Sequence, residues 1–163
     1  MEFYQAVIDD LPAALLLYKF ATEHMIEQGI EQWDAIYPTR EVLKDDIERG
    51  TMYVYKQGGE LVAAFVVNQE YEMEYEQVNW NYPDTSFAVI HRLCVHPAFE
   101  NRGIGAVAMQ QAEAIIKDMG IKTVRLDTCI DNPSAVRLYE KLNYTNMGTV
   151  TFRHVCYCYE KLL

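Results

Sequence analysis

The sequence predicts an α/β (α+β) protein in which helices cover both faces of a mixed central sheet, within a single domain spanning residues 1–163. Strand-like runs and helix-like runs alternate along the chain, which is typical of a sheet with crossover helices. Half of the residues are hydrophobic, and this is enough apolar surface for one core. No internal repeat, low-complexity tract or linker divides the chain.

Capping residues and glycines set the expected bounds of the elements in the N-terminal half. Asp10 and Pro12 suit the first turn of a helix, and Thr39 suits the cap of a second helix. The paired glycines Gly58 and Gly59 suit a tight turn between two strands. The expected elements are a strand at 3–8, a helix from 9 to 29, a helix from 39 to 50, and strands at 51–56 and 61–68.

The C-terminal half predicts alternating strands and helices up to an aromatic last strand. Residues 71–85 are acidic, aromatic and aperiodic, so we assign them to a loop or irregular strand with no defined role. The expected elements are strands at 87–95, 123–127 and 149–159, a helix from 103 to 120, and a helix from 133 to 142. The aromatic last strand could pack a homodimer or complete the core.

The formal net charge of -10 bears on the class of partner. Such a field repels phosphates, which argues against nucleic acid or an anionic membrane surface and is compatible with amine substrates. No signal peptide or membrane-length apolar run is evident, so we expect a cytoplasmic protein that does not enter membranes. The four cysteines match no zinc ligand set, so we expect no metal and interpret them as buried, reduced thiols. They are Cys94, Cys129, Cys156 and Cys158.

The segment from Val95 to Ala106 carries the first chemical signal. A strand ends, a short glycine-containing loop follows, and an amphipathic helix begins, so backbone N–H groups at the helix start could receive a phosphate or pyrophosphate. Gly103 and Gly105 would let the ligand approach, and Arg102 could add positive charge. The same residues are also compatible with nothing more than a tight turn. The loop lacks the third glycine of a dinucleotide fingerprint and the Gly-Lys-Ser/Thr of a P-loop.

Two blocks of sequence resemble the GNAT superfamily of N-acyltransferases. Residues 90–97 (IHRLCVHP) and 100–105 (ENRGIG) are similar to the acetyl-CoA segment of that family, and residues 124–144 are similar to its strand, asparagine loop and tyrosine helix. The resemblance implies a mostly antiparallel sheet and an acetyl-CoA-dependent enzyme. The chain departs from the pattern at Glu100, where Gln or Arg is common, and at Asn143, where Gly is usual. We expect Glu100 to point away from the pyrophosphate.

The resemblance also implies how acetyl-CoA is held. The strand at residues 93–95 would splay from its neighbour and pair with the pantetheine arm, and a backbone N–H near Leu93 would polarise the thioester carbonyl. Asn132 would contact the pantetheine arm, although capping of the helix at Pro133 explains this residue equally well. The cofactor-binding residues implied are Leu93, Cys94, Val95, Asn101, Arg102, Gly103, Ile104, Gly105, Ala106, Asn132, Ala135 and Tyr139.

Two residues are candidates for proton transfer, and two more for acceptor binding. By resemblance, Tyr139 lies beside the thioester sulfur, where a protonated phenol can donate to the departing thiolate. His91 is two residues before Leu93, so strand alternation predicts a shared face, and an imidazole there could act as base or simply be a core histidine. Trp33 and Tyr37 fall where the family builds its acceptor pocket, and could equally anchor the core.

The sequence therefore predicts an N-acetyltransferase that moves an acetyl group from acetyl-CoA to a primary amine by direct attack. A non-catalytic acyl-CoA sensor is one alternative, and acetylation of a protein N-terminus or lysine is another. Cys94 has no base partner in the sequence, so an acyl-enzyme is not expected. The acceptor, the acyl chain length and the general base are not identified at this level.

Overall fold

The structure, a computed structural model, describes residues 1–163 and contains a seven-stranded sheet with four α-helices. The strands are β1 (Glu2–Gln5), β2 (Met52–Gln57), β3 (Glu60–Asn68), β4 (Phe87–Val95), β5 (Thr123–Cys129), β6 (Thr145–Thr151) and β7 (Val155–Leu162). The helices are α1 (Leu11–Glu27), α2 (Arg40–Glu48), α3 (Ile104–Asp118) and α4 (Pro133–Lys141), with short 3-10 turns η1 (Ile8–Asp10), η2 (Met73–Gln77) and η3 (Pro97–Phe99). No helix is both long and apolar enough to cross a membrane.

The sheet has the strand order β1-β2-β3-β4-β5-β7-β6, and only the β4–β5 pair is parallel. The predicted mixed, mostly antiparallel sheet is therefore confirmed. The single last strand expected at 149–159 is wrong, because this region forms the β6–β7 hairpin with a turn at residues 152–154. Strand β6 is exposed at five of its seven residues, so it lacks the apolar alternation that would have predicted it.

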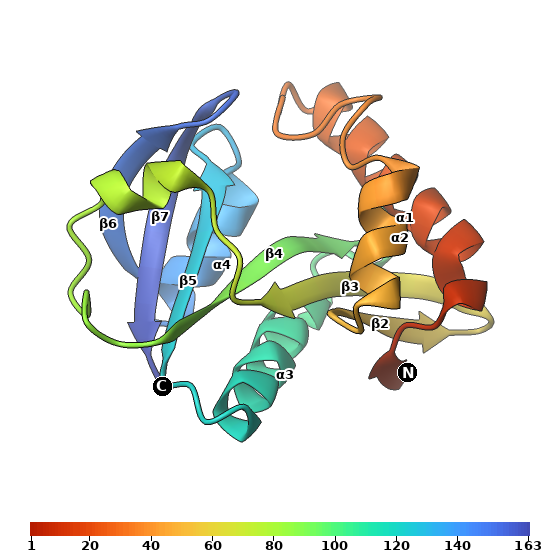
Figure 1. Cartoon of the computed structure of the whole chain (residues 1–163). Coiled ribbons are helices and arrows are strands. Elements are labelled where there is room, and N and C mark those ends of the chain that lie inside the picture. Colours follow the sequence, from red (N-terminus) through yellow and green to blue (C-terminus); the bar gives the residue numbers. More distant parts are fainter.

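Helices cover both faces of the sheet and enclose two large cores (Figure 1). Helices α1 and α2 pack on one face of β2, β3 and β4 around buried residues such as Leu17, Leu43 and Val66. Helix α3 packs on the other face, where Met109 and Ile116 meet the sheet. A smaller cluster lies between η2 and the β5–β7 half of the sheet. Different elements cover the three clusters, and the sheet contributes residues to all of them.

Strands β4 and β5 separate soon after they begin. They pair only from Phe87–Thr123 to Val89–Arg125, and no ladder joins them beyond that point. Figure 1 shows the green β4 and the cyan β5 diverging toward the side where the loop between α1 and α2 lies. The backbone edge of β4 that faces β5 is therefore unpaired over residues 90–95. A sheet with an internal unpaired edge offers hydrogen-bonding groups to a ligand.

A β-bulge interrupts β4 where it diverges from β5. Between the pairs Ala64–Cys94 and Val66–His91, one residue of β3 lies opposite two residues of β4. Arg92, inside the bulge, has the left-handed φ of 51°. Since this conformation is unfavourable for a residue with a Cβ, surrounding contacts must stabilise it.

Helices α1 and α2 supply those contacts. The Arg92 guanidinium donates to both carboxylate oxygens of Asp46 on α2, with Nε–Oδ2 2.9 Å and Nη2–Oδ1 2.6 Å. The Tyr18 hydroxyl on α1 donates to the Arg92 carbonyl at 2.7 Å. The side chains of Arg92 and Asp46 are only 13% and 7% exposed. The bulge is therefore held from both helices by a bidentate ion pair and a buried hydrogen bond.

We expect Asp46→Asn to lower the free energy of unfolding by about 3 kcal/mol, because it leaves the poorly hydrated Arg92 guanidinium without its charge partner. Urea titration followed by circular dichroism measures this. Asp45→Asn is the matched control, since Asp45 pairs with Arg49 on the exposed side of α2, and should leave the stability almost unchanged. Equal stability of the two variants would contradict the role given to Asp46.

Candidate active site

A large cavity lies where β4 and β5 diverge. It has a volume of about 960 Å³ and is lined by 21 residues. Its walls come from the α1–α2 loop, the chain between β3 and η2, strands β4 and β5, helix α4 and the β6–β7 turn. The lining includes Gln32, Trp33, Tyr37, Glu70, Tyr71, Glu72, Glu74, Tyr75, His91, Arg92, Leu93, Asp127, Tyr139, Phe152, Arg153 and His154.

The start of α3 has the free groups expected of an anion site. The amides of Ile104, Gly105 and Ala106 donate to no backbone acceptor, and they lie at the positive end of a fifteen-residue helix. Gly103 has a left-handed φ of 78°, and a Cβ built on it would meet nothing within 4 Å. A ligand can therefore approach Gly103 closely. Gly105 differs, because its added Cβ would lie 3.3 Å from a Leu138 methyl, so this glycine serves helix–helix packing.

The two charged residues of this loop turn in opposite directions. The Glu100 carboxylate lies 3.3 Å from His24 on α1, so it points away from the α3 amides, as predicted. Arg102 donates to the Ala98 carbonyl at 2.9 Å and covers the Phe99 ring. Asn101 takes the left-handed φ of 59° and keeps its backbone exposed. The loop thus presents amides and a positive charge, with its carboxylate withdrawn.

The residues of β4 after the bulge divide between the two cores. Leu93 and Val95 pack against the α3 side of the sheet, whereas Cys94 is buried on the α1 side. Burial raises the pKa of the Cys94 thiol to about 12, so it is protonated at neutral pH and unsuited to nucleophilic attack. Any contact of Cys94 with a ligand would come from its backbone.

Asn132 caps α4. Its side-chain oxygen accepts from the Ala135 amide at 3.2 Å, and its side-chain nitrogen donates to Gln32 on the α1–α2 loop at 3.0 Å. Of the two uses predicted for Asn132, the structure shows the helix cap. The second bond also ties the start of α4 to the opposite wall of the cavity. Ala135 lies in the same first turn and packs partly against the core.

Tyr139, on helix α4, lines the cavity. Its side chain is 7% exposed, and no protein group hydrogen-bonds its hydroxyl. Burial, together with the negative charge of Asp127, raises the pKa of Tyr139, so the phenol keeps its proton at neutral pH. This protonated, unpartnered hydroxyl is suited to donating a proton to a bound group.

Asp127, on β5, is a candidate that the sequence reasoning missed. It is a partly buried carboxyl on the cavity wall, and it accepts a 2.6 Å hydrogen bond from the Tyr75 hydroxyl. Burial raises the pKa of Asp127, and the charge of Glu72 raises it further against the opposing hydrogen bond. A carboxylate with a raised pKa is a better base near neutral pH than an exposed one. An acidic residue within the predicted strand at 123–127 was the available signal.

His91 lies in the cavity wall with its ring orientation fixed. Its Nε2 atom lies 2.9 Å from Asn68 Oδ1 and 3.1 Å from the Glu70 carbonyl. Asn68 Oδ1 also accepts from the Glu70 amide, so both partners of Nε2 are acceptors and Nε2 must carry the proton. Burial, with the nearby Arg92 charge, lowers the pKa of His91 to about 4. The neutral ring therefore donates from Nε2 to the end of β3 and the residues that follow it. Its Nδ1 atom keeps a free lone pair.

The predicted shared face of His91 and Leu93 is wrong. The bulge inserts one residue at this point, so side-chain alternation is broken and Leu93 packs toward α3 with Ile90. Both residues still line the cavity. No glycine or proline in the strand marked the irregularity.

The predicted acceptor-pocket aromatics do reach the cavity. Trp33 is 7% exposed and packs against Tyr18, so it anchors the core and lines the cavity at once. The Tyr37 hydroxyl accepts from Arg92 Nη1 at 3.0 Å. Lining the cavity and anchoring the core, the two uses expected for these aromatic residues, are therefore compatible.

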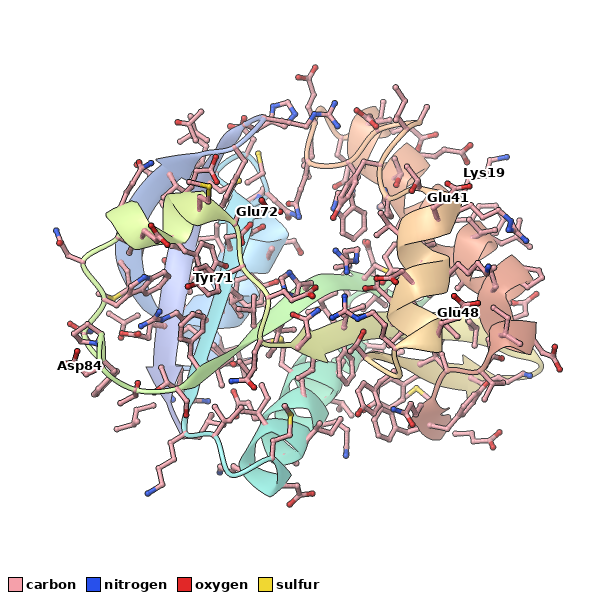
Figure 2. All side chains as sticks on the ribbon, viewed as in Figure 1. Lys19, Glu41, Glu48, Tyr71, Glu72 and Asp84 are labelled. Carbon is pink, nitrogen blue, oxygen red and sulfur yellow. The ribbon has the colours of Figure 1, made fainter.

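Another part of the cavity wall that the sequence did not predict comes from η2 and the chain between β3 and η2. The sequence assigned residues 71–85 to a loop or irregular strand with no defined role. Figure 2 labels Tyr71 and Glu72 on this stretch. Tyr71 stacks on Tyr75 with ring centroids 6.1 Å apart, and Glu74 lies on the first turn of η2. All four residues line the cavity. The acidic and aromatic composition of this segment was a signal of function. The segment has no helical or strand periodicity, so the sequence did not predict where it lies in the fold.

The fold and the loop-and-cavity arrangement define an acyltransferase, and sequence comparison identifies the family. Residues 13–144 match the acetyltransferase (GNAT) family, so the chain belongs to that family. An N-acetyltransferase of Bacillus subtilis (strain 168), YesJ, is 27% identical over 146 residues, covering 88% of this chain and 81% of that protein.

Solved structures show the same fold. An acetyltransferase of the GNAT family from Streptococcus agalactiae 2603 superposes with a TM-score of 0.88 at 24% identity, covering 99% of this chain and 95% of that one. The ribosomal-protein-S18-alanine N-acetyltransferase of Escherichia coli superposes with a TM-score of 0.71 at 15% identity, covering 99% and 92%. The protein is thus an N-acetyltransferase by family.

We expect the His91 ring to remain neutral down to about pH 5, with the proton on Nε2, because burial and Arg92 disfavour the imidazolium. Nitrogen-15 NMR of the imidazole, assigned with a His91→Gln variant, reports both the tautomer and the midpoint. The midpoint should lie near pH 4. A midpoint at or above the usual value of about 6.5 would show that the site stabilises the charged ring.

Proposed function

We propose that the protein transfers an acetyl group from acetyl-CoA to a primary amine by direct attack of the amine nitrogen. The observation that carries this proposal is the pairing of Asp127 and Tyr139 in one cavity. The carboxyl on β5 and the phenol on α4 are close enough for the Asp127 charge to raise the pKa of Tyr139. One is a proton acceptor and the other a proton donor, which are the two functions that aminolysis of a thioester needs.

The unpaired elements of the structure fit acetyl-CoA. The free amides at the start of α3 and the open approach to Gly103 suit the pyrophosphate. The unpaired edge of β4 after the bulge suits the amide groups of the pantetheine arm. An acetyl-CoA molecule bound by both features would run along β4 from the loop to the cavity. Its acyl end would then lie between Leu93 and Tyr139. Tyr139 would then be beside the thioester sulfur.

The reaction consumes an amine and acetyl-CoA and yields an N-acetyl amide and free coenzyme A thiol. The N–C bond forms, the C–S bond breaks, and one proton leaves nitrogen while one reaches sulfur. Asp127 first accepts a proton from the incoming ammonium, which frees the amine for attack, and later releases that proton to solvent. The Tyr139 hydroxyl gives its proton to the departing sulfur, and the proton that the nitrogen loses as the amide forms restores the phenol. A backbone N–H near Leu93, in the β4 bulge, would stabilise negative charge on the carbonyl oxygen. Cys94 takes no part, because its thiol is buried and protonated.

The competing functions fit the cavity less well. A sensor of acyl-CoA needs a binding loop and the β4 edge, but it needs no buried carboxyl beside a protonated phenol. His91 loses the role of general base, because its Nε2 is committed as a donor and its pKa is low. Transfer to a protein acceptor is supported here by fold likeness alone, at 15% identity to an enzyme named for a ribosomal protein.

We expect Tyr139→Phe to lower the turnover number roughly 100-fold, because the phenyl ring fills the same space but cannot donate a proton. Thiol release from acetyl-CoA measures turnover. The stabilisation of the protein by acetyl-CoA should persist, since the ring and the binding loop are unchanged. Tyr144→Phe is the matched control. It removes a hydroxyl that donates to Glu113 outside the cavity, so it should affect the melting temperature more than turnover. Full activity of Tyr139→Phe would refute the assignment of the acid.

A further inference from the structure

The cations that line the cavity are neutralised by residues outside it. Arg92 forms its bidentate ion pair with Asp46 on α2. Arg153, on the β6–β7 turn, is paired with Asp34 on the α1–α2 loop. His91 is uncharged at neutral pH, because burial lowers its pKa to about 4. No lysine lines the cavity. Neither arginine of the cavity is therefore free to meet an anionic ligand.

The carboxylates of the cavity are not neutralised in the same way. Four of them line it, and one, Glu70, pairs with Arg49. The other three, Glu72, Glu74 and Asp127, form no ion pair with any residue of the protein. The residual charge of the wall is thus negative. An uncompensated set of like charges around a hollow attracts cations and repels anions.

These three carboxylates lie at different depths. Asp127 is partly buried on β5 and fixed by the Tyr75 hydroxyl at 2.6 Å. Glu72 is exposed, and Glu74 is half-buried on η2. The charge of Glu72 raises the pKa of Asp127, so the two carboxylates act on each other with no cation between them. The cavity is therefore lined by one carboxylate fixed on a strand of the sheet and by two on the more exposed chain around η2.

Unpartnered polar groups and aromatic rings form the rest of the wall. The Trp33 indole N–H and the Tyr139 hydroxyl have no hydrogen-bond partner in the protein, although both side chains are only 7% exposed and both line the cavity. Both groups are therefore free to hydrogen-bond a ligand in the cavity. The rings of Tyr71 and Tyr75 are stacked, and Tyr75 also contacts Phe152. The exposed Tyr71 ring can receive an alkylammonium chain.

We propose that the acceptor is a small dication, namely a diamine or polyamine whose reacting amine meets Asp127 and Tyr139 while a second ammonium group meets Glu72 and Glu74. This inference rests on the proposed function and adds the class of acceptor. The aromatic wall between the two ends covers the methylene chain. An amine that carries a carboxylate in place of the second ammonium would bring an anion to the same two glutamates and would be disfavoured.

A series of amines of equal length tests the class of acceptor. The probes are 1,4-diaminobutane, butylamine and 4-aminobutanoate, with the five- and six-carbon series alongside, each assayed for coenzyme A thiol release. The three members of a series share the reacting amine and differ only in the charge at the far end. We expect kcat/KM to decrease in the order diamine, monoamine, amino acid. The advantage of the diamine should decline as salt is added, because the mouth of the cavity is exposed.

The double variant Glu72→Gln with Glu74→Gln assigns the effect to those two carboxylates. It should raise the KM of the diamine about fivefold, and leave the KM of butylamine within a factor of two. Glu76→Gln is the matched control, since Glu76 lies on the same short helix but does not line the cavity. Melting temperatures verify that the double variant and the control remain folded.

The outcomes separate the two levels of the proposal. Equal kcat/KM for the diamine and the monoamine, or a preference for the amino acid, overturns the dication and leaves the amine acetyltransferase intact. A diamine preference that survives in the double variant overturns the role of Glu72 and Glu74. Stabilisation by acetyl-CoA with no thiol release for any amine would refute the proposed function, and the acceptor class with it.

Discussion

The separation of β4 from β5 is the constraint on which the rest of the molecule depends. Pairing between the two strands stops at Val89, and the bulge at Arg92 turns the following residues away. The ion pair of Arg92 with Asp46 holds this irregular backbone from the far side of the sheet. A strained backbone, stabilised by a buried pair, thus creates the binding surface.

The cavity combines features that reduce stability with features that restore it. Burial makes the charge of Asp127 costly, and the charge of Glu72 adds to that cost. Opposite walls are joined by Arg153–Asp34 and by Asn132–Gln32, which connect the β6–β7 turn and α4 to the α1–α2 loop. These cross-links keep the cavity defined while its carboxylates remain unpaired. Such a trade of stability for function is common at active sites.

Local patterns predicted the elements and the loop, and tertiary contacts decided the rest. Gly103 and the helix starts were visible because capping and left-handed glycine are local properties, whereas Tyr139 was singled out by the resemblance to the GNAT pattern. Strand β6 was missed because most of its side chains are exposed, and the bulge was missed because Arg92 carries no local signal of a left-handed backbone. Asp127 and the segment from Tyr71 to Tyr75 gain their role only when η2 folds over β5, which no local pattern in the sequence specifies.

The central claim is that Asp127 accepts the amine proton, and the pH dependence of kcat in Asp127→Asn tests it most directly. Burial raises the pKa of Asp127, so in the unmodified protein kcat should fall as pH decreases through a value above the usual carboxyl range. The asparagine keeps the size and the bond from Tyr75 but cannot accept a proton. We predict a loss of roughly 100-fold in kcat and disappearance of that acid limb. Asp131→Asn, at the exposed start of the next turn, should keep the original profile. An Asp127→Asn enzyme with unchanged kcat and the same acid limb would contradict the account.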